Sequence, residues 1–146
     1  MITVIQRVSS ASVTVDRQII GQIDQGVVAL IAIEKNDNAQ TANRLLQRIL
    51  SYRIFADDSD RMNLSLKDMN AGLLLIPQFT LAADTDKGNR PSFSSAAAPE
   101  LGKQLFDFLR EQALTAHSKV QFGRFGADMK IALVNDGPVT FMLRAQ

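Results

Sequence analysis

The sequence predicts an α/β fold of the α+β type, in which two main helices pack on one strand-rich sheet. Three observations support this prediction. The chain has 146 residues and is 46% hydrophobic, which suits one domain with its own core. Strand-like alternation of apolar and polar residues occupies both ends of the chain, and two amphipathic helical segments lie between them. We therefore expect residues 1–146 to form a single domain.

The first 33 residues have the pattern of consecutive strands. Apolar residues alternate with polar ones through residues 2–16, which predicts two half-buried strands, and a third strand is expected over residues 19–23. Residues 27–33 are seven consecutive apolar residues, a pattern typical of a central strand that is covered on both faces. The predicted arrangement is a meander.

Two segments have helical periodicity. The first can be capped by Asp37 or Asn38, and its inward residues are Ala42, Leu45, Leu46, Ile49 and Leu50. The second begins at Pro99, which suits a first helical turn, and its inward residues are Leu101, Leu105, Phe108 and Leu109. Residues 120–134 are predicted to form two strands around a glycine-rich bend. A turn at residues 135–138 then leads to a last strand at residues 139–143.

The stretch of residues 73–81 carries most of the functional information. Its apolar residues run up to Pro77, which disfavours helical geometry before it, so a buried strand is predicted there. If the chain stays extended, Gln78 and Thr80 share one face and Phe79 points to the other. An amide beside a hydroxyl can position a polar substrate. The alternative is that Gln78 is solvated, Phe79 is a core residue and Thr80 only favours β structure.

A polar loop is predicted to follow over residues 82–93. Loops of this length in compact domains are usually functional or mobile. Lys87 and Arg90 are the candidates in this loop for contacts with phosphate groups, although charged loops are also commonly only solvated.

Composition excludes several kinds of chemistry. The net charge is +1, so a nucleic-acid partner requires a local patch. There is no cysteine, His117 is the only histidine and is expected at the surface, and the acidic residues 57–60 lack the pattern of a calcium loop. We expect no metal, no cofactor and activity that survives chelation. Because no nucleotide-binding glycine motif or serine triad is supported, an enzyme would act through backbone amides, Gln78 and Thr80, which suits ester hydrolysis.

The sequence also gives expectations about location. No basic region precedes an apolar block near residue 1, and no apolar run approaches about 18 residues. We therefore expect a cytoplasmic protein that has no membrane partner.

Four motifs in order along the chain resemble those of the D-aminoacyl-tRNA deacylase family. They occupy residues 77–81, 84–93, 123–129 and 135–140. Met1, residues 6–8, residues 53–55 and the chain length agree with that family as well. The resemblance implies a compact β-barrel-like sheet with helices packed on it, in a homodimer. It also implies a metal-independent esterase that removes D-amino acids, and glycine mischarged on alanine tRNA, from the 3′ end of aminoacyl-tRNA.

The resemblance further implies roles for individual residues. The residues implied at the terminal adenosine and the ester are Gln78, Phe79 and Thr80. Gly137 and Pro138, joined by a cis peptide bond, would reach into the partner's pocket and exclude L-amino acids, with Arg7 near this filter. This chain departs from the family at Pro77, where serine is usual, so a hydroxyl and an amide hydrogen are missing there.

Two alternatives stay open from the residues alone. Thr80 could be a nucleophile, but no base is evident beside it, so assistance by the tRNA's own 2′-hydroxyl is the favoured mechanism. The second alternative concerns function: a non-catalytic tRNA- or DNA-binding dimer, whose contact residues would be Lys87, Arg90 and Arg124. Turnover of D-Tyr-tRNA by catalytic amounts of protein would separate the enzyme from the binder.

Overall fold

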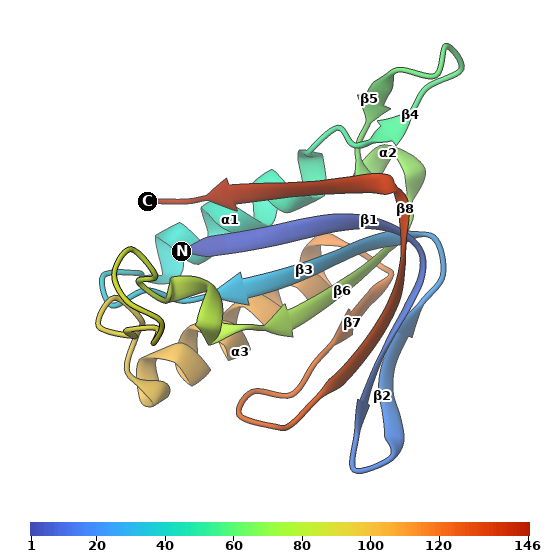
Figure 1. The fold of residues 1–146 in the computed structure, drawn as a ribbon. Coiled ribbons are helices and arrows are strands. Elements are labelled where there is room, and N and C mark those ends of the chain that lie inside the picture. The colour runs from blue at the N-terminus through green and yellow to red at the C-terminus, as the bar shows by residue number, and fades with distance from the viewer.

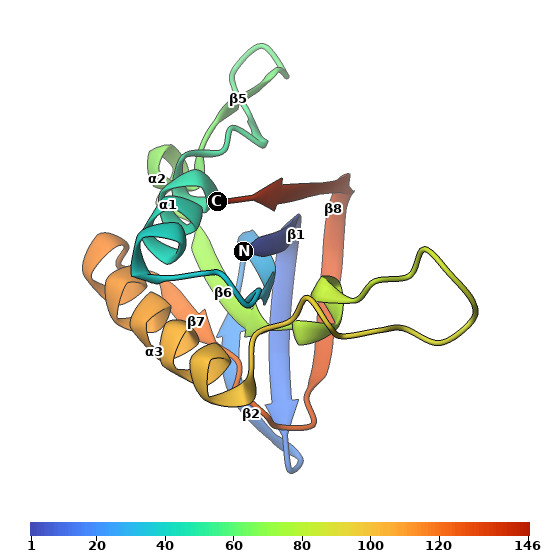
Figure 2. The ribbon, with the colours of Figure 1, turned by 90° about the vertical axis from the view of Figure 1, so that its left-hand side faces the viewer.

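A curved, nearly closed sheet with helices on its outer side makes up the molecule, and the computed structural model describes all 146 residues (Figures 1 and 2). The strands of this sheet are β1 (Ile2–Val15), β2 (Gln18–Ile23), β3 (Gly26–Ala32), β6 (Gly72–Pro77), β7 (Val120–Phe122) and β8 (Lys130–Arg144). Their order is β2-β1-β3-β6-β7, and β8 pairs with β1. The predicted α+β, barrel-like fold class is confirmed.

Helices and a small hairpin complete the chain. The helices are α1 (Ala39–Ser51), α2 (Leu66–Met69), α3 (Pro99–Ala116) and the 3-10 helix η1 (Phe79–Ala82). The hairpin consists of β4 (Phe55–Ala56) and β5 (Met62–Leu64), and it projects from one corner of the molecule (Figure 1). Asn38 caps α1, because its side chain accepts from the backbone N–H of Gln40 and of Thr41. None of the helices is both long and apolar enough to cross a membrane.

The predicted meander is wrong, because β1 is one continuous strand that serves several partners. Residues 2–8 of β1 pair antiparallel with β3, and residues 11–15 pair with β2. Ser9 and Ser10, which interrupt the apolar alternation, are exposed at an irregularity inside this strand and form no loop. The strands β2 and β3 therefore do not pair with each other, although they are consecutive in the chain.

The strand β6 lies in the middle of the protein, as its apolar run predicts. It pairs in parallel with β3 on one side and with β7 on the other. Leu73 and Leu75 pack into the larger core cluster with α1 and α3, whereas Leu74 and Ile76 pack into a smaller cluster inside the curve of the sheet. Burial on both faces explains why β6 has no polar residue before its carboxyl end.

The sequence placed the acidic turn at residues 57–60 correctly and the only histidine, His117, wrongly. His117 is buried, only 8% exposed, and not at the surface as expected. It ends α3, and its Nε2 lies 2.7 Å from the carbonyl oxygen of Ala71, which can only accept, so Nε2 donates the hydrogen. The acidic segment at residues 57–60 is a turn, in which the Asp57 carboxylate accepts from the backbone N–H of Ser59 and of Arg61. These bonds lower the pKa of Asp57 below its ordinary value.

Candidate functional site

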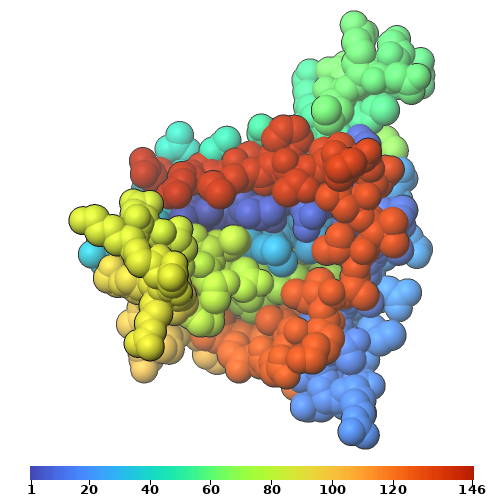
Figure 3. Space-filling view, viewed as in Figure 1, coloured from blue at the N-terminus to red at the C-terminus, as the bar shows by residue number.

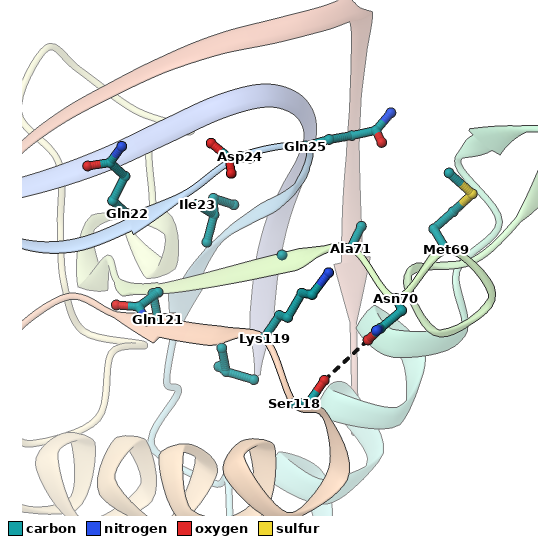
Figure 4. Close-up of a pocket in the computed structure, with 12 residues that line it drawn as sticks. Gln22, Ile23, Asp24, Gln25, Met69, Asn70, Ala71, Ser118, Lys119 and Gln121 are labelled. Atoms are coloured by element: carbon teal, nitrogen blue, oxygen red, sulfur yellow. Dashed lines mark hydrogen bonds between the residues drawn. The ribbon is translucent and has the colours of Figure 1, made fainter.

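Two pockets of similar size lie at opposite ends of β6. The pocket at the Gly72 end has a volume of about 510 Å³, and its walls come from the β2–β3 turn, the α2–β6 connection and the start of β7 (Figure 4). A hydrogen bond of 3.2 Å from Ser118 Oγ to Asn70 Oδ1 joins two of these walls. None of the site residues predicted from the sequence lines this pocket.

The pocket at the Pro77 end, which we call the β6 carboxyl-end pocket, contains two of the predicted site residues. Its volume is about 480 Å³, and six of its eleven lining residues are hydrophobic. One wall is formed by Pro77, Gln78 and Phe79. The remaining lining comes from the start of α3 and from the segment that joins β7 to β8. A concave, mostly apolar site with a few convergent polar groups is typical of small-molecule pockets.

The extended path predicted after Pro77 is wrong. Pro77 has no N–H for the strand ladder, and the next donor, Gln78 N, bonds to Ile31 O at 2.7 Å. The chain then turns into η1, where Leu81 N donates to Gln78 O at 3.2 Å. Gln78 and Thr80 nevertheless stay together, because Gln78 Nε2 donates to Thr80 Oγ1 at 2.5 Å. The amide and the hydroxyl form a pair, of which Gln78 lines the pocket and Thr80 does not.

Phe79 is not a core residue. It is 59% exposed, and its ring packs on that of Phe93 with a centroid distance of 5.1 Å. Phe93 is also exposed and comes from the end of the polar loop, so the two rings connect this loop to the pocket wall. Exposed aromatic side chains that border a pocket favour a ligand contact over a purely structural role.

The polar loop projects from this end of the molecule (Figure 2). Two backbone hydrogen bonds of 2.7 and 3.0 Å between Asp84 and Ser92 close its base. Lys87 and Arg90 are exposed in the loop, and neither lines the pocket. The fold therefore leaves both cations accessible but does not bring them into the pocket.

Sequence reasoning missed the wall formed by Phe125 and Met129. The sequence feature that could have indicated this wall is the pair of glycines, Gly123 and Gly126, in residues 123–129. A Cβ on Gly123 would lie 2.8 Å from Met129 Sδ and 3.1 Å from Pro77 Cδ, so glycine lets this segment pack closely against the end of β6. Gly123 N also donates to Leu75 O at 2.8 Å, which fixes the segment to the strand.

Gly137 and Pro138 lie in a bulge of β8, outside this pocket. The pairing of β8 with β1 jumps from Asn135 to Thr140, so residues 136–139 stand out at the bend of the strand (Figure 1). The Gly137–Pro138 peptide bond is cis. Both residues are exposed, and neither lines the pocket of its own chain.

The Arg7 side chain stabilises this bulge through hydrogen bonds and an ion pair. Its Nε donates to Asp136 O at 3.1 Å and lies 3.2 Å from Asp136 Oδ2, and its Nη1 donates to Ile54 O at 2.7 Å. On the other side of the bulge, Asn135 Oδ1 accepts from Val139 N at 3.0 Å. Side chains therefore hold the bulge at both ends, although its surface is open to solvent.

The segments described above border one face of the molecule (Figure 3). In this view, β8 in red bounds the face above and at the right, the β7–β8 segment in orange bounds it below, and the polar loop in yellow bounds it at the left. Between them, β1 and β6 are visible deeper in the molecule. This face is hollowed between the three segments.

Comparisons with known proteins agree on one family. The family model described as D-Tyr-tRNA(Tyr) deacylase matches residues 4–144. A protein of Pseudomonas fluorescens named D-aminoacyl-tRNA deacylase is 57% identical over 140 residues, and the match covers 96% of this chain and 97% of that protein. A protein of the same name from Teredinibacter turnerae is 56% identical over 145 residues, with 99% and 100% covered.

Two solved structures have the same fold. The c-Myc DNA Unwinding Element Binding Protein is 34% identical with a TM-score of 0.95, and the match covers 100% of this chain and 99% of that one. A probable eukaryotic D-amino acid tRNA deacylase has a TM-score of 0.84 over 97% of each chain, and at 18% identity it supports the fold alone. With a family model that matches nearly the whole chain and relatives more than half identical to it, this chain belongs to the D-aminoacyl-tRNA deacylase family, a family of hydrolases.

Proposed function

We propose that this protein hydrolyses the ester bond of D-aminoacyl-tRNA, and of glycine mischarged on alanine tRNA, and releases the free amino acid and the tRNA. The observation that carries the proposal is the β6 carboxyl-end pocket. It combines a mostly apolar cavity with the Gln78–Thr80 pair, whose Gln78 lines the cavity. Such a site can hold a flat nucleoside and present polar groups to an ester beside it.

We assign the terminal adenosine of the tRNA to this cavity. The volume of about 480 Å³ lies within the range of ordinary small-molecule sites. The rings of Phe79 and Phe125 line it, and stacking of a base on an aromatic side chain contributes about 1–3 kcal/mol. With the base in the cavity, the ribose and its ester would lie at the mouth, next to Gln78 and Thr80.

The polar groups at the mouth can stabilise the reaction without an ionised side chain. Phe79 and Thr80 begin η1, so their backbone N–H groups have no acceptor within this helix and can donate to an oxyanion. Thr80 Oγ1 accepts from Gln78 Nε2, which leaves its own hydroxyl hydrogen free to donate. We assign Gln78 and Thr80 to positioning the ester, and the two backbone N–H groups to the developing negative charge.

The proton transfer is assigned to the substrate. Asp128 is the one carboxylate that lines the pocket, but it is exposed and forms an ion pair with Lys130 at 2.8 Å. The 2′-hydroxyl of the terminal ribose stands next to the ester in every aminoacyl-tRNA. Water adds to the ester carbonyl carbon, the bond from that carbon to the ribose oxygen breaks, and the proton lost by water ends on the departing oxygen. The 2′-hydroxyl assists this transfer.

We assign rejection of L-amino acids to Gly137 and Pro138 of a second subunit. A filter that accepts many D side chains has to test the direction in which the side chain leaves the α-carbon. Backbone atoms in a fixed position can do this, and Arg7 and Asn135 hold the bulge at both ends. An L side chain would collide with this backbone. Glycine has no side chain to collide, so it would be accepted.

A homodimer is part of the proposal. The bulge does not line the pocket of its own chain, so it needs a second copy to reach a pocket. The strand β8 pairs only with β1, which leaves its other edge without a partner in one chain. The exposed apolar side chains Val134 and Met142 lie on this strand. An open edge with apolar residues favours pairing with another chain.

Contacts with the body of the tRNA are assigned to Lys87 and Arg90 in the projecting loop. Few such contacts are expected because the net charge is only +1, so the affinity should fall less steeply with salt than that of a strongly basic protein. An aminoacyl-tRNA substrate is consistent with a cytoplasmic location.

The proposal is tested by turnover with chiral substrates. Catalytic amounts of the protein are incubated with D-Tyr-tRNA and with L-Tyr-tRNA, and the released tyrosine per protein is measured with and without EDTA. We expect many turnovers on the D substrate, very few on the L substrate and no effect of EDTA. No release from D-Tyr-tRNA would refute the proposed activity. A Pro138→Ala protein that keeps full selectivity would refute the role of the bulge but not the activity.

The second candidate function is a non-catalytic tRNA- or DNA-binding dimer. The observation that favours it is the relative at 34% identity whose name describes binding to a DNA unwinding element. Its contact residues here would be Lys87, Arg90 and Arg124, all exposed. A binder would retain labelled RNA or DNA in a gel-shift experiment and release no amino acid from D-Tyr-tRNA.

A further inference from the structure

A cationic groove lies directly beside the β6 carboxyl-end pocket. It has a volume of about 340 Å³ and runs between the outer face of α3 and the end of β7. The residues that line it are Ile20, Lys103, Asp107, Arg110, Gln121, Phe122, Gly123, Arg124 and Phe125. Phe125 lines both cavities, so a single ring separates the groove from the pocket assigned to the terminal adenosine.

The groove concentrates positive charge on a chain that is nearly neutral. Three of its nine lining residues are cations and one is an anion, whereas the whole chain carries a net charge of only +1. Asp107 lies 2.6 Å from Lys103 Nζ and 3.6 Å from Arg110 Nη1, so one carboxylate is shared by two cations. Arg124 has only an exposed Asp16 carboxylate at 4.0 Å. The local charge is therefore not balanced and favours an anionic ligand.

The packing of α3 fixes where two of these cations stand. Lys103, Asp107 and Arg110 follow each other at helical spacing on one face of α3. A Cβ on Gly102 would lie 3.1 Å from the Phe125 ring, so the helix approaches the shared wall closely. The Arg110 guanidinium lies over the Phe122 ring, 4.9 Å from its centroid. A stacked guanidinium is pre-oriented, and its planar set of N–H groups matches phosphate geometry.

We infer that this groove binds the backbone phosphates of the single strand that immediately precedes the terminal nucleotide of the tRNA. This inference rests on the proposed function, because it requires the terminal base in the neighbouring pocket. The strand would pass over Phe125 and follow α3, with its phosphates beside Lys103, Arg110 and Arg124. Phosphate contacts carry no base sequence, and tRNAs share one 3′-terminal sequence, so a cationic groove that contacts the phosphates suits this strand.

The test compares a long and a minimal substrate. The Lys103→Gln/Arg110→Gln double variant is assayed on D-Tyr-tRNA and on the D-tyrosyl ester of adenosine, which has the terminal nucleoside but no preceding phosphates. We expect KM for D-Tyr-tRNA to rise about tenfold at low salt, with kcat within about twofold, because two charge contacts to the bound strand are lost. The kcat/KM for the adenosine ester should stay within about twofold of wild type, because that substrate never occupies the groove.

Salt dependence gives a second readout. For a single strand, each phosphate contact contributes about 0.7 to the slope of log affinity against log salt. The double variant should therefore reduce the slope of log kcat/KM for D-Tyr-tRNA by about 1.4. The matched control is Lys67→Gln/Lys119→Gln. It removes two exposed lysines that line neither the β6 carboxyl-end pocket nor the groove. This control should leave KM and the slope close to wild type. Thermal melting of both variants checks that they are folded.

Three outcomes separate the possibilities. An equal loss on D-Tyr-tRNA and on the adenosine ester would overturn the inference, because the residues would then act through the pocket. Unchanged KM and slope on D-Tyr-tRNA would also overturn it. Absence of turnover by the wild-type protein would refute the proposed function instead. In that case, fluorescence anisotropy with a labelled, uncharged tRNA still tests the groove, and equal binding by wild type and double variant would overturn it.

Discussion

The two ends of β6 carry pockets of nearly equal volume, about 510 and 480 Å³, yet they differ in what their polar groups do. At the Gly72 end, backbone groups and the Ser118–Asn70 pair join elements of the fold, and other polar side chains line the pocket without bonding across it. Gly72 N donates to Gln25 O at 2.9 Å, Leu73 N donates to Lys119 O at 2.8 Å, and His117 bonds to Ala71 O. A Cβ on Gly26 would lie 2.0 Å from Gly72 O, so two backbones touch there. Three segments are therefore joined at this end: the β2–β3 turn, the α2–β6 connection and the segment between α3 and β7.

At the Pro77 end the strand ladder stops, and polar groups are left over. Pro77 brings no N–H, and the amide and hydroxyl of Gln78 and Thr80 bond to each other rather than to the rest of the fold. Phe79 places an aromatic ring in solvent, where it contributes little to the core. Groups that the fold does not use are available to a ligand. We infer that the site lies at the Pro77 end because that pocket is mostly apolar and Gln78 of the Gln78–Thr80 pair lines it, and not because of its size.

The largest expected effect comes from filling each pocket with a phenyl ring. Ala127→Phe places the ring in the β6 carboxyl-end pocket, where we assign the adenosine. We expect kcat/KM for D-Tyr-tRNA to fall by up to about a hundredfold, because a stacked base contributes up to about 3 kcal/mol and each 1.4 kcal/mol is tenfold. Steady-state kinetics on D-Tyr-tRNA measures this loss.

The matched change at the Gly72 end is Ser118→Phe. It places the same ring in the other pocket and removes only the hydrogen bond to Asn70. We expect kcat/KM within about twofold of wild type, because no group there is assigned to the substrate. If Ser118→Phe lost as much activity as Ala127→Phe at equal thermal stability, the assignment of the two ends would be reversed.

The second prediction concerns the polar pair itself. Thr80→Ala removes the hydroxyl that accepts from Gln78 Nε2, and Thr80→Ser keeps it. If Thr80 positions the ester, alanine should lower kcat roughly tenfold to a hundredfold, and serine should restore most of it. A nucleophile would behave differently. An acyl group trapped on Thr80 would show that Thr80 forms a covalent intermediate, and a fall of the alanine variant to the uncatalysed rate would refute the positioning role.

The comparison also explains which parts of the fold could be predicted from sequence. The strand β6 and the helices α1 and α3 follow from local apolar spacing, and each begins and ends close to where the pattern predicts. The meander failed because pairing partners are not encoded locally. Ser9 and Ser10 break the alternation of apolar and polar residues, which indicates two strands. In the structure, pairing with neighbouring strands on both edges keeps β1 continuous. His117 was misplaced because its burial depends on a carbonyl acceptor 46 residues away in the chain.

The site was predictable in its residue types but not in its geometry. Gln78 and Thr80 were identified as neighbours, but their contact arises from a 3-10 turn and not from an extended strand. The strand ends at Pro77 and η1 begins at Phe79, whereas a face-alternation argument assumes that the chain stays extended. The wall formed by Phe125 and Met129 comes from a segment that is distant in the chain, so no local pattern could place it beside Gln78.

The smallest expected effect is on stability at the Gly72 end. Asp68 lies in α2, and its carboxylate accepts from Ser65 Oγ at 2.6 Å and from Ser65 N at 2.8 Å. These bonds, with a smaller contribution from Arg53, lower the pKa of Asp68 below its ordinary value of 3.8. A carboxyl whose pKa is lower in the folded state stabilises the fold above the unfolded pKa. This stabilisation is lost as the pH falls through the folded pKa.

Asp68→Asn removes this charge and leaves the β6 carboxyl-end pocket untouched. We expect the melting temperature at pH 7 to fall by about 1–2 °C, because Asp68 is exposed and one capping interaction is weakened. The difference from wild type should shrink as the pH falls below 3.8 and vanish below the lowered pKa of folded Asp68, where the wild-type carboxyl is also protonated. Activity on D-Tyr-tRNA at pH 7 should not change. A large loss of activity without a loss of stability would mean that the Gly72 end acts on the substrate, and the contrast between the two ends of β6 would not hold.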